Sequence, residues 1–344
     1  MSRFISRLIG FGLAIGFLLG GAAFATEPNP TETGQAEPPA QSFGTEAQGA
    51  GPQPDLAYGA FQRGYYLSAF AIATKDAGTG DSAAQTLLGQ IYEHGYGIPQ
   101  DFKKSASWYE LASQAGDREA QYRLGLFYLD GLGVATSREK AAHYFKLASD
   151  KGQSKAAYNL GLFYLEGDIF EKDFEKAAAL FQIAAKANNG DAQYALALMY
   201  KRGQGVDQDN AKAASWFRNA ALSGHLPAQI ELAIMVFNGI GTPKDEAQAA
   251  LWFKQAAQSG NAVAMNRLAR LYAAGLGVPT DPIEAGKWHI RARKAGISDL
   301  WLDGFLESLD QKAQEEALAR AYPKQSDQAT ALVNEPEPQA EKPQ

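Results

Sequence analysis

The sequence has no cysteine among its 344 residues. No disulfide can form, and a lipoprotein anchor, which needs a cysteine, is excluded. The folded chain must therefore be held together by side-chain packing alone.

A surplus of basic residues is also missing. The chain has 32 lysines and arginines against 38 acidic residues, a net charge of −6. Residues 1–25 hold two of the arginines and no acid, so their removal would bring the net charge to −8. Such an acidic surface disfavours nucleic acid as a partner.

The one long apolar run lies at the start of the chain. It covers Leu8 to Phe24, follows Arg3 and Arg7, and ends in Ala23-Phe24-Ala25. This pattern is typical of a secretory signal peptide, with cleavage expected after Ala25 and a periplasmic location for the mature chain. The alternative is an uncleaved membrane anchor, because the run of about 17 residues is near the lower limit for a span.

Six copies of a 36-residue unit fill residues 81–296. Their register never slips, because equivalent residues recur one period apart: Ala84, Ala120, Ala156, Ala192, Ala228, Ala264 and Leu88, Leu124, Leu160, Leu196, Leu232, Leu268. The residue after each leucine is small, glycine in the first three units and alanine in the last three. A fixed period of this length predicts a solenoid, since one unit cannot bury its apolar face alone.

Each unit predicts two helices. The first, near Ala84 to His94 in the first unit, ends at Gly95, which can take the left-handed C-cap conformation. The second follows a loop acid or serine that could bond free helical N–H groups, although the cap could lie a few residues later: Asp101, Ser137, Asp173, Asp209, Asp245 and Asp281. Small residues alternate there with a large aromatic, which is expected to fill the space between layers.

These columns resemble the Sel-1-like repeat family, a relative of the tetratricopeptide repeats. The family motif is A-x-x-x-L-G-x-x-Y-x-x-G-x-G-V-x-x-D, then A-A-x-W-(F/Y)-x-x-A-A-x-x-G, and the match covers residues 81–296. The resemblance implies an all-α, right-handed α-solenoid of six helix-turn-helix repeats. The third unit has Asp168-Ile169-Phe170 in place of the glycine loop, so its loop is expected to differ. In the sixth unit Gly286 and His289 replace the usual alanine and aromatic residue.

The segments on either side of the repeats are predicted to be disordered or to cap the solenoid. Residues 26–55 form a disordered linker and residues 323–344 a disordered tail, because both lack large apolar side chains. Residues 56–80 form an N-terminal half repeat. Residues 297–322 form C-terminal capping helices, of which the apolar one around Leu300, Leu302 and Phe305 is expected to cover the last repeat.

The candidate binding site is a stripe on four successive first helices. Its members stand two positions before, two positions after and five positions after the repeated leucine of each unit. This spacing places them on one face of the helix. They are Tyr122, Leu126, Leu129, Tyr158, Leu162, Leu165, Tyr194, Leu198, Lys201, Ile230, Ile234 and Phe237. In the tetratricopeptide domains that this chain resembles, these positions line the groove that holds a partner's peptide or helix. The tyrosines are the favoured contacts, since each offers area and a hydroxyl.

The alternative is that this stripe is core between neighbouring first helices, which would leave the acidic outer face for binding. The stripe positions are polar in the first unit (Thr86, Gln90, Glu93) and mostly polar in the sixth (Asn266, Arg270, Ala273). They are expected to bound the apolar patch at both ends.

Side chains that could carry catalysis do not converge. The four histidines, His94, His143, His225 and His289, fall at different phases of the repeat, unlike a metal or acid–base site. No nucleophile elbow, zinc motif or phosphate loop is present. The sequence therefore predicts no catalytic residue, no metal and no cofactor.

The predicted function is a non-catalytic interaction scaffold or regulator in the bacterial cell envelope. Resemblance to exported Sel-1-like proteins suggests a protein partner, such as a sensor kinase's periplasmic domain or an envelope-assembly factor. A cell-wall (glycan or peptidoglycan)-associated factor or enzyme is the alternative. A glycan site would need exposed aromatics beside paired carboxylates, whereas this stripe is aliphatic and tyrosine.

The aromatic column of the second helices allows a check on the register. If Trp216 is interhelical core, its replacement by alanine should cost roughly 3–5 kcal/mol of unfolding free energy. A loss below about 1 kcal/mol would place Trp216 on the surface instead.

Overall fold

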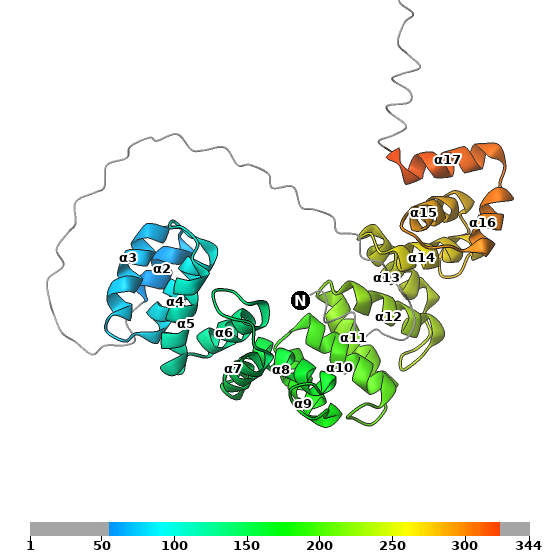
Figure 1. Cartoon of the computed structure of the whole chain (residues 1–344). Coiled ribbons are helices and arrows are strands. Elements are labelled where there is room, and N and C mark those ends of the chain that lie inside the picture. The colour runs from blue at the N-terminus through cyan, green and yellow to red at the C-terminus, as the bar shows by residue number, and fades with distance from the viewer. Residues whose placement is uncertain (1–54, 324–344) are drawn as a thin grey trace, which may run out of the picture. The chain divides into compact units, whose positions relative to one another are not determined.

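The computed structural model describes residues 55–323, which form a stack of helices (Figure 1). The predicted leader, and nearly all of the predicted linker and tail, lie outside the described residues. The helices are α2 Leu56–Gln62, α3 Tyr66–Ala77, α4 Ser82–His94, α5 Phe102–Gln114, α6 Arg118–Asp130, α7 Arg138–Asp150, α8 Ser154–Glu166, α9 Phe174–Lys186, α10 Gly190–Arg202, α11 Asn210–Leu222, α12 Leu226–Asn238, α13 Glu246–Gln258, α14 Ala262–Ala274, α15 Pro282–Lys294, α16 Leu300–Glu307 and α17 Gln311–Ala321. Within residues 55–323 there is no strand, and no helix has the length and apolarity needed to cross a membrane.

Helices α4 to α15 are the six predicted pairs. Each of them has 13 residues, and equivalent helices start 36 residues apart. Every first helix packs on its own second helix, which in turn packs on the next first helix. Before them, the seven-residue α2 packs on α3, so the half repeat has a shortened first helix. The all-α repeat architecture predicted from the sequence is confirmed.

The predicted helix ends are confirmed at the level of single hydrogen bonds. Gly95 has φ 73° and caps α4 in the left-handed conformation. All six of the predicted loop acids and serine are N-caps of second helices; Asp101, for example, accepts from the backbone N–H of Lys104 at 3.0 Å. Side chains thus satisfy donors that the helix itself leaves free.

In the core of each repeat, a ring from the second helix packs directly on a small residue of the first helix. A Cβ added to Gly125 on α6 would lie 2.5 Å from the Phe145 ring on α7, closer than atoms can approach. The same relation holds between Gly89 and Tyr109, at 2.4 Å. The rings in this column are almost fully buried: Tyr109, Phe145, Phe181, Phe217 and Phe253. The small residue is therefore required because the two helices approach too closely for a larger side chain.

Trp216 is not the fully buried core residue that was predicted, although Trp288, in the same column of the sixth repeat, is buried. Trp216 is only partly buried, whereas the next residue, Phe217, is fully buried. One residue along a helix turns the side chain by about 100°, so Phe217 faces its own first helix. Trp216 instead packs at the edge of the core, where it touches clusters from two successive repeats.

The loop of the third repeat differs from the others, as expected. In the second repeat, Gly133 has φ 67°, and a Cβ there would lie 2.2 Å from the carbonyl oxygen of Phe102. Ile169 occupies the equivalent place without a left-handed conformation. The next residue, Phe170, stacks on the Tyr164 ring at 4.8 Å between centroids. Here an apolar contact replaces the tight glycine turn.

The C-terminal cap is built differently from the prediction. The apolar helix α16 buries only Leu302, and Leu300 is 85% exposed. The more polar α17 packs closely on α15 through Ala317, whose Cβ would be 2.9 Å from a Cβ at Gly286. The other departure of the sixth repeat, His289, is buried and bonds Asp303 of α16 at 2.8 Å. The two departures from the repeat therefore make the contacts with the capping helices, Gly286 with α17 and His289 with α16.

The different depths of Phe217 and Trp216 lead to a prediction. Phe217→Ala should cost roughly 3–5 kcal/mol of unfolding free energy, because it empties a fully buried site. Trp216→Ala should cost about 2 kcal/mol, because that side chain is only partly buried. Denaturant unfolding of the two variants beside the wild type measures both. Equal losses would contradict the assignment of the two faces.

Candidate functional site

The twelve residues of the predicted stripe lie on α6, α8, α10 and α12 at an intermediate depth. Tyr122 and Leu198 are buried, at 6% and 7% exposure. The other ten are partly exposed, and none is fully exposed. The stripe is therefore neither sealed core nor free surface, but a band of mostly apolar side chains that pack on the repeat cores beneath them. We call these twelve residues the first-helix trough.

The three tyrosines of the trough point mainly inward. Tyr158 packs on the core ring of Phe181 at 5.6 Å, and Tyr194 packs on Phe217 at the same distance. Burial raises the pKa of Tyr158 well above its ordinary value and that of Tyr194 to about 12, which agrees with their inward orientation. Tyr158 and Tyr194 are nevertheless partly exposed, as most of the aliphatic residues of the trough are. That a tyrosine hydroxyl meets a partner stays a prediction.

Ion pairs between repeats cross the trough. Lys201 of α10 pairs with Glu231 of α12 at 2.7 Å, so this predicted site residue is already engaged within the chain. Nearer the N-terminus, Arg123 pairs with Glu93 of the preceding repeat at 3.4 Å, and the Tyr109 hydroxyl donates to Glu93 at 2.6 Å. The polar end expected at the first repeat is thus a network of satisfied charges.

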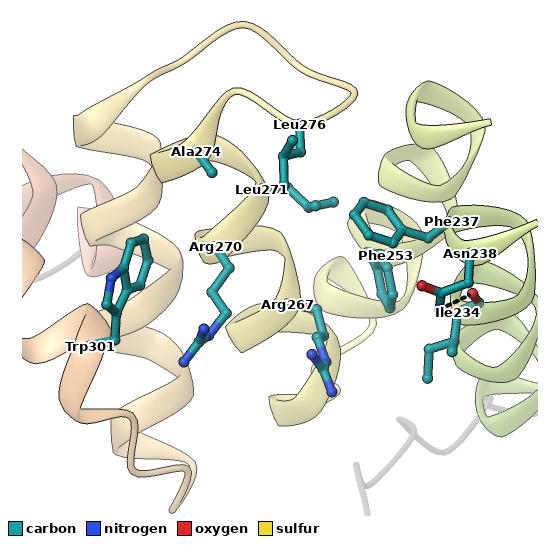
Figure 2. A pocket seen from close by; sticks show the side chains of 10 residues that line it. All are labelled: Ile234, Phe237, Asn238, Phe253, Arg267, Arg270, Leu271, Ala274, Leu276 and Trp301. Atoms are coloured by element: carbon teal, nitrogen blue, oxygen red, sulfur yellow. Dashed lines mark hydrogen bonds between the residues drawn. The ribbon is translucent and has the colours of Figure 1, made fainter. Parts of the chain in front are cut away.

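The other end of the trough opens into a pocket of about 370 Å³. Figure 2 shows Trp301 and Arg270 on one side, Phe237 and Phe253 on the other, and Arg267 between them. The lining residues come from α12, α13, α14, the loop after α14, and α16: Ile234, Phe237, Asn238, Phe253, Arg267, Arg270, Leu271, Ala274, Leu276 and Trp301. Two of the predicted trough residues, Ile234 and Phe237, therefore belong to this pocket.

Sequence reasoning missed the part that α16 plays here. Asp299, 9% exposed, accepts two hydrogen bonds of 2.7 Å from Arg270 and one of 2.8 Å from Asn266. Arg270 also lies over the Trp301 ring, 5.2 Å from its centroid. The sixth repeat was expected to bound the patch, yet its polar residues anchor a helix that extends the pocket. The signal that the sequence offered was Trp301, a tryptophan that lies after the last repeat.

The histidines have structural partners. His289 bonds Asp303, and His225 caps α12 by accepting from the N–H of Ala228 at 3.2 Å. His94 stacks on Tyr96 at 5.1 Å, and His143 lies edge-on to the Tyr144 ring at 5.4 Å. Among residues 55–323, no cluster of three potential ligands could hold a metal ion.

The Asp299 anchor should make stability depend on pH. Burial alone would raise its pKa, but hydrogen bonds from Arg270 and Asn266 outweigh burial and lower the pKa from 3.8 to about 2. A lowered pKa stabilises the fold above the ordinary value, and this contribution is lost as pH falls from about 4 to 2. Asp299→Asn should therefore cost up to about 2 kcal/mol at pH 7 and nothing near pH 2. Denaturant midpoints of variant and wild type against pH measure this, and a constant offset at every pH would contradict it.

Comparison with known proteins agrees with the architecture. The Sel1 repeat model matches six consecutive segments, residues 82–117, 118–153, 154–189, 190–225, 226–261 and 262–297. A protective antigen of uropathogenic Escherichia coli with this repeat fold aligns with 25% identity and a TM-score of 0.65, over 84% of this chain and 66% of the antigen. A Sel1 repeat protein from Oxalobacter formigenes aligns with 27% identity and a TM-score of 0.60, over 71% of this chain and 97% of that one. No curated protein matches by sequence. With the repeat model matched across residues 82–297, the chain belongs to the Sel1 repeat family.

Proposed function

We propose that this Sel1 repeat scaffold acts without catalysis in the bacterial cell envelope, holding a segment of a partner protein in the first-helix trough. The observation that carries the proposal is the continuous half-buried apolar stripe on four successive first helices. Apolar side chains at this depth lose little entropy on binding, because the cores beneath already hold them in place.

The form of the trough favours a protein segment over a glycan. The carboxylates that cross it are engaged, Glu231 with Lys201 and Glu93 with Arg123. A glycan site would use such groups to bond sugar hydroxyls. An apolar stripe that ends in a pocket with tryptophan and arginine instead has the residues that dominate protein interfaces. A sensor kinase's periplasmic domain or an envelope-assembly factor is the kind of partner we propose.

The proposed location depends on the leader at residues 1–25. The mature chain is expected to begin at Thr26 and to be found in the periplasm. Mass spectrometry of the chain recovered from a periplasmic extract tests this directly. Recovery of the uncleaved chain in the membrane fraction would contradict cleavage and show that the leader is a membrane anchor.

Crosslinking in envelope extracts tests the trough. Leu162→Ser with Ile234→Ser should remove most of the captured partner, because the two changes interrupt the apolar stripe in two different repeats. The expected loss of stability is moderate, since both side chains are only partly buried. Circular dichroism and an unfolding curve establish that the variant is folded.

A matched control uses an exposed apolar residue away from the trough. Leu251 on α13 is 67% exposed, so Leu251→Ser removes similar apolar surface from a second helix. This control should capture the partner as the wild type does. Equal capture by the folded trough variant, or loss in the Leu251 control alone, would move the binding surface to the second helices.

A further inference from the structure

The pocket at the end of the first-helix trough contains an arginine whose charge is free. Arg267 is exposed and makes no ion pair within residues 55–323. Within that part of the chain, no acidic side chain lines the pocket. The carboxylate of Asp299 is already bonded to Arg270 and Asn266. A carboxylate arriving from elsewhere would therefore meet an unopposed guanidinium, on a chain that is otherwise acidic.

The rest of the pocket suits a bulky apolar side chain. Phe237, Leu271 and Ile234 supply an apolar floor, and Trp301 stands half exposed at the rim. The Asp299 bonds hold Arg270 beneath Trp301, so this wall is organised before any ligand arrives. The lining is complementary to an apolar residue followed closely by a carboxylate.

After the predicted leader, two segments outside the described residues have that sequence. Leu332 and Val333 are followed by Glu335, and Phe43 is followed by Glu46. Phe43 precedes α2, at the opposite end of the stack of repeats. Leu332 follows α17, which belongs to the same end as the pocket. The C-terminal segment is therefore the better placed of the two.

The chain between α17 and Leu332 is long enough. Helix α17 packs on α15, α15 packs on α14, and α14 lines the pocket. Two helix-to-helix spacings of about 8–10 Å each thus separate α17 from α14. The segment from Pro323 to Leu332 can span about 30 Å when extended. That length exceeds the lateral separation of the α17 and α14 axes.

We propose that residues 331–337 of this chain occupy the pocket, with Leu332 on the apolar floor and the Glu335 carboxylate on Arg267. The inference rests on the proposed function, since the tail would fill one end of the trough that holds the partner. A partner segment would then have to displace the tail before it could use this end. The occupant is the chain's own segment, and an external segment or a second copy is an alternative outcome of the test.

A labelled peptide of residues 328–339 is the probe, and its binding to the full-length chain is followed by fluorescence anisotropy. In the wild type, the attached tail competes at a high effective concentration and keeps the apparent affinity low. Leu332→Asp in the chain should release the pocket and raise the affinity for the peptide by at least about tenfold. Ala340→Asp adds the same charge to the tail outside the segment and should leave the affinity unchanged.

A second change tests the ion pair. Arg267→Glu, added to the Leu332→Asp chain, should weaken peptide binding about tenfold, because it places two like charges together. Arg267 is exposed, so this change should leave the fold intact. Undiminished binding by the Arg267→Glu chain would show that the peptide lies on another surface, and would overturn the proposal.

The remaining outcomes also test whether the tail occupies the pocket. Equal affinity of the wild-type, Leu332→Asp and Ala340→Asp chains would overturn occupancy by the tail. A difference that disappears on dilution would assign the occupant to a second copy. If the peptide binds none of the chains while an envelope partner still crosslinks through the trough, the tail inference fails and the proposed function stands.

Discussion

The close approach of the two helices within each repeat is the constraint on which the structure depends. Gly125 lies directly against the Phe145 ring, with no room for another carbon atom at ordinary contact distance. This fit fixes how far one helix may slide or rotate on the other, because the ring has a single cavity to fill. Each pair therefore presents the same faces to the next one, and the first-helix trough can run through four repeats without a break.

The same constraint explains the end of the stack. The sixth repeat has no following pair, and two of its residues depart from the repeat to receive other helices. Gly286 lets α17 approach α15 through Ala317. His289 stands where the other repeats have an aromatic residue, and it forms a hydrogen bond to Asp303. A repeat protein must close its last apolar face, and here the closure also brings Trp301 to the trough. Capping and binding surface are thus built from the same short helices.

Charge along the trough is distributed unevenly. Its N-terminal end is a closed network in which Glu93, Arg123 and Tyr109 satisfy one another. Its middle is crossed by the Lys201–Glu231 pair. At the C-terminal end, Arg267 has no counter-charge within residues 55–323. The charges therefore favour one orientation of an acidic segment in the trough, because its binding free energy is most favourable when its carboxylate lies at the pocket.

The 36-residue period by itself determined the helices, their order and their ends. Caps such as Gly95 and Asp101 act through local geometry, so their positions follow from residue type and spacing. The stripe from Tyr122 to Phe237 was also visible, because helical spacing decides which residues share a face. Its half-buried depth was not visible, since depth depends on how neighbouring helices lean on one another.

Only the tertiary structure decided the rest. Trp216 and Phe217 are adjacent aromatics, and no local rule says which of them meets the first helix. The pocket joins residues about 30 positions apart, as in the bonds between Arg270 and Asp299, and lies where the repeat phase has ended. Periodicity predicts contacts that recur, so the sequence determined the repeating core. The pocket is made once, by helices packing across the end of the stack, and packing alone brought its residues together.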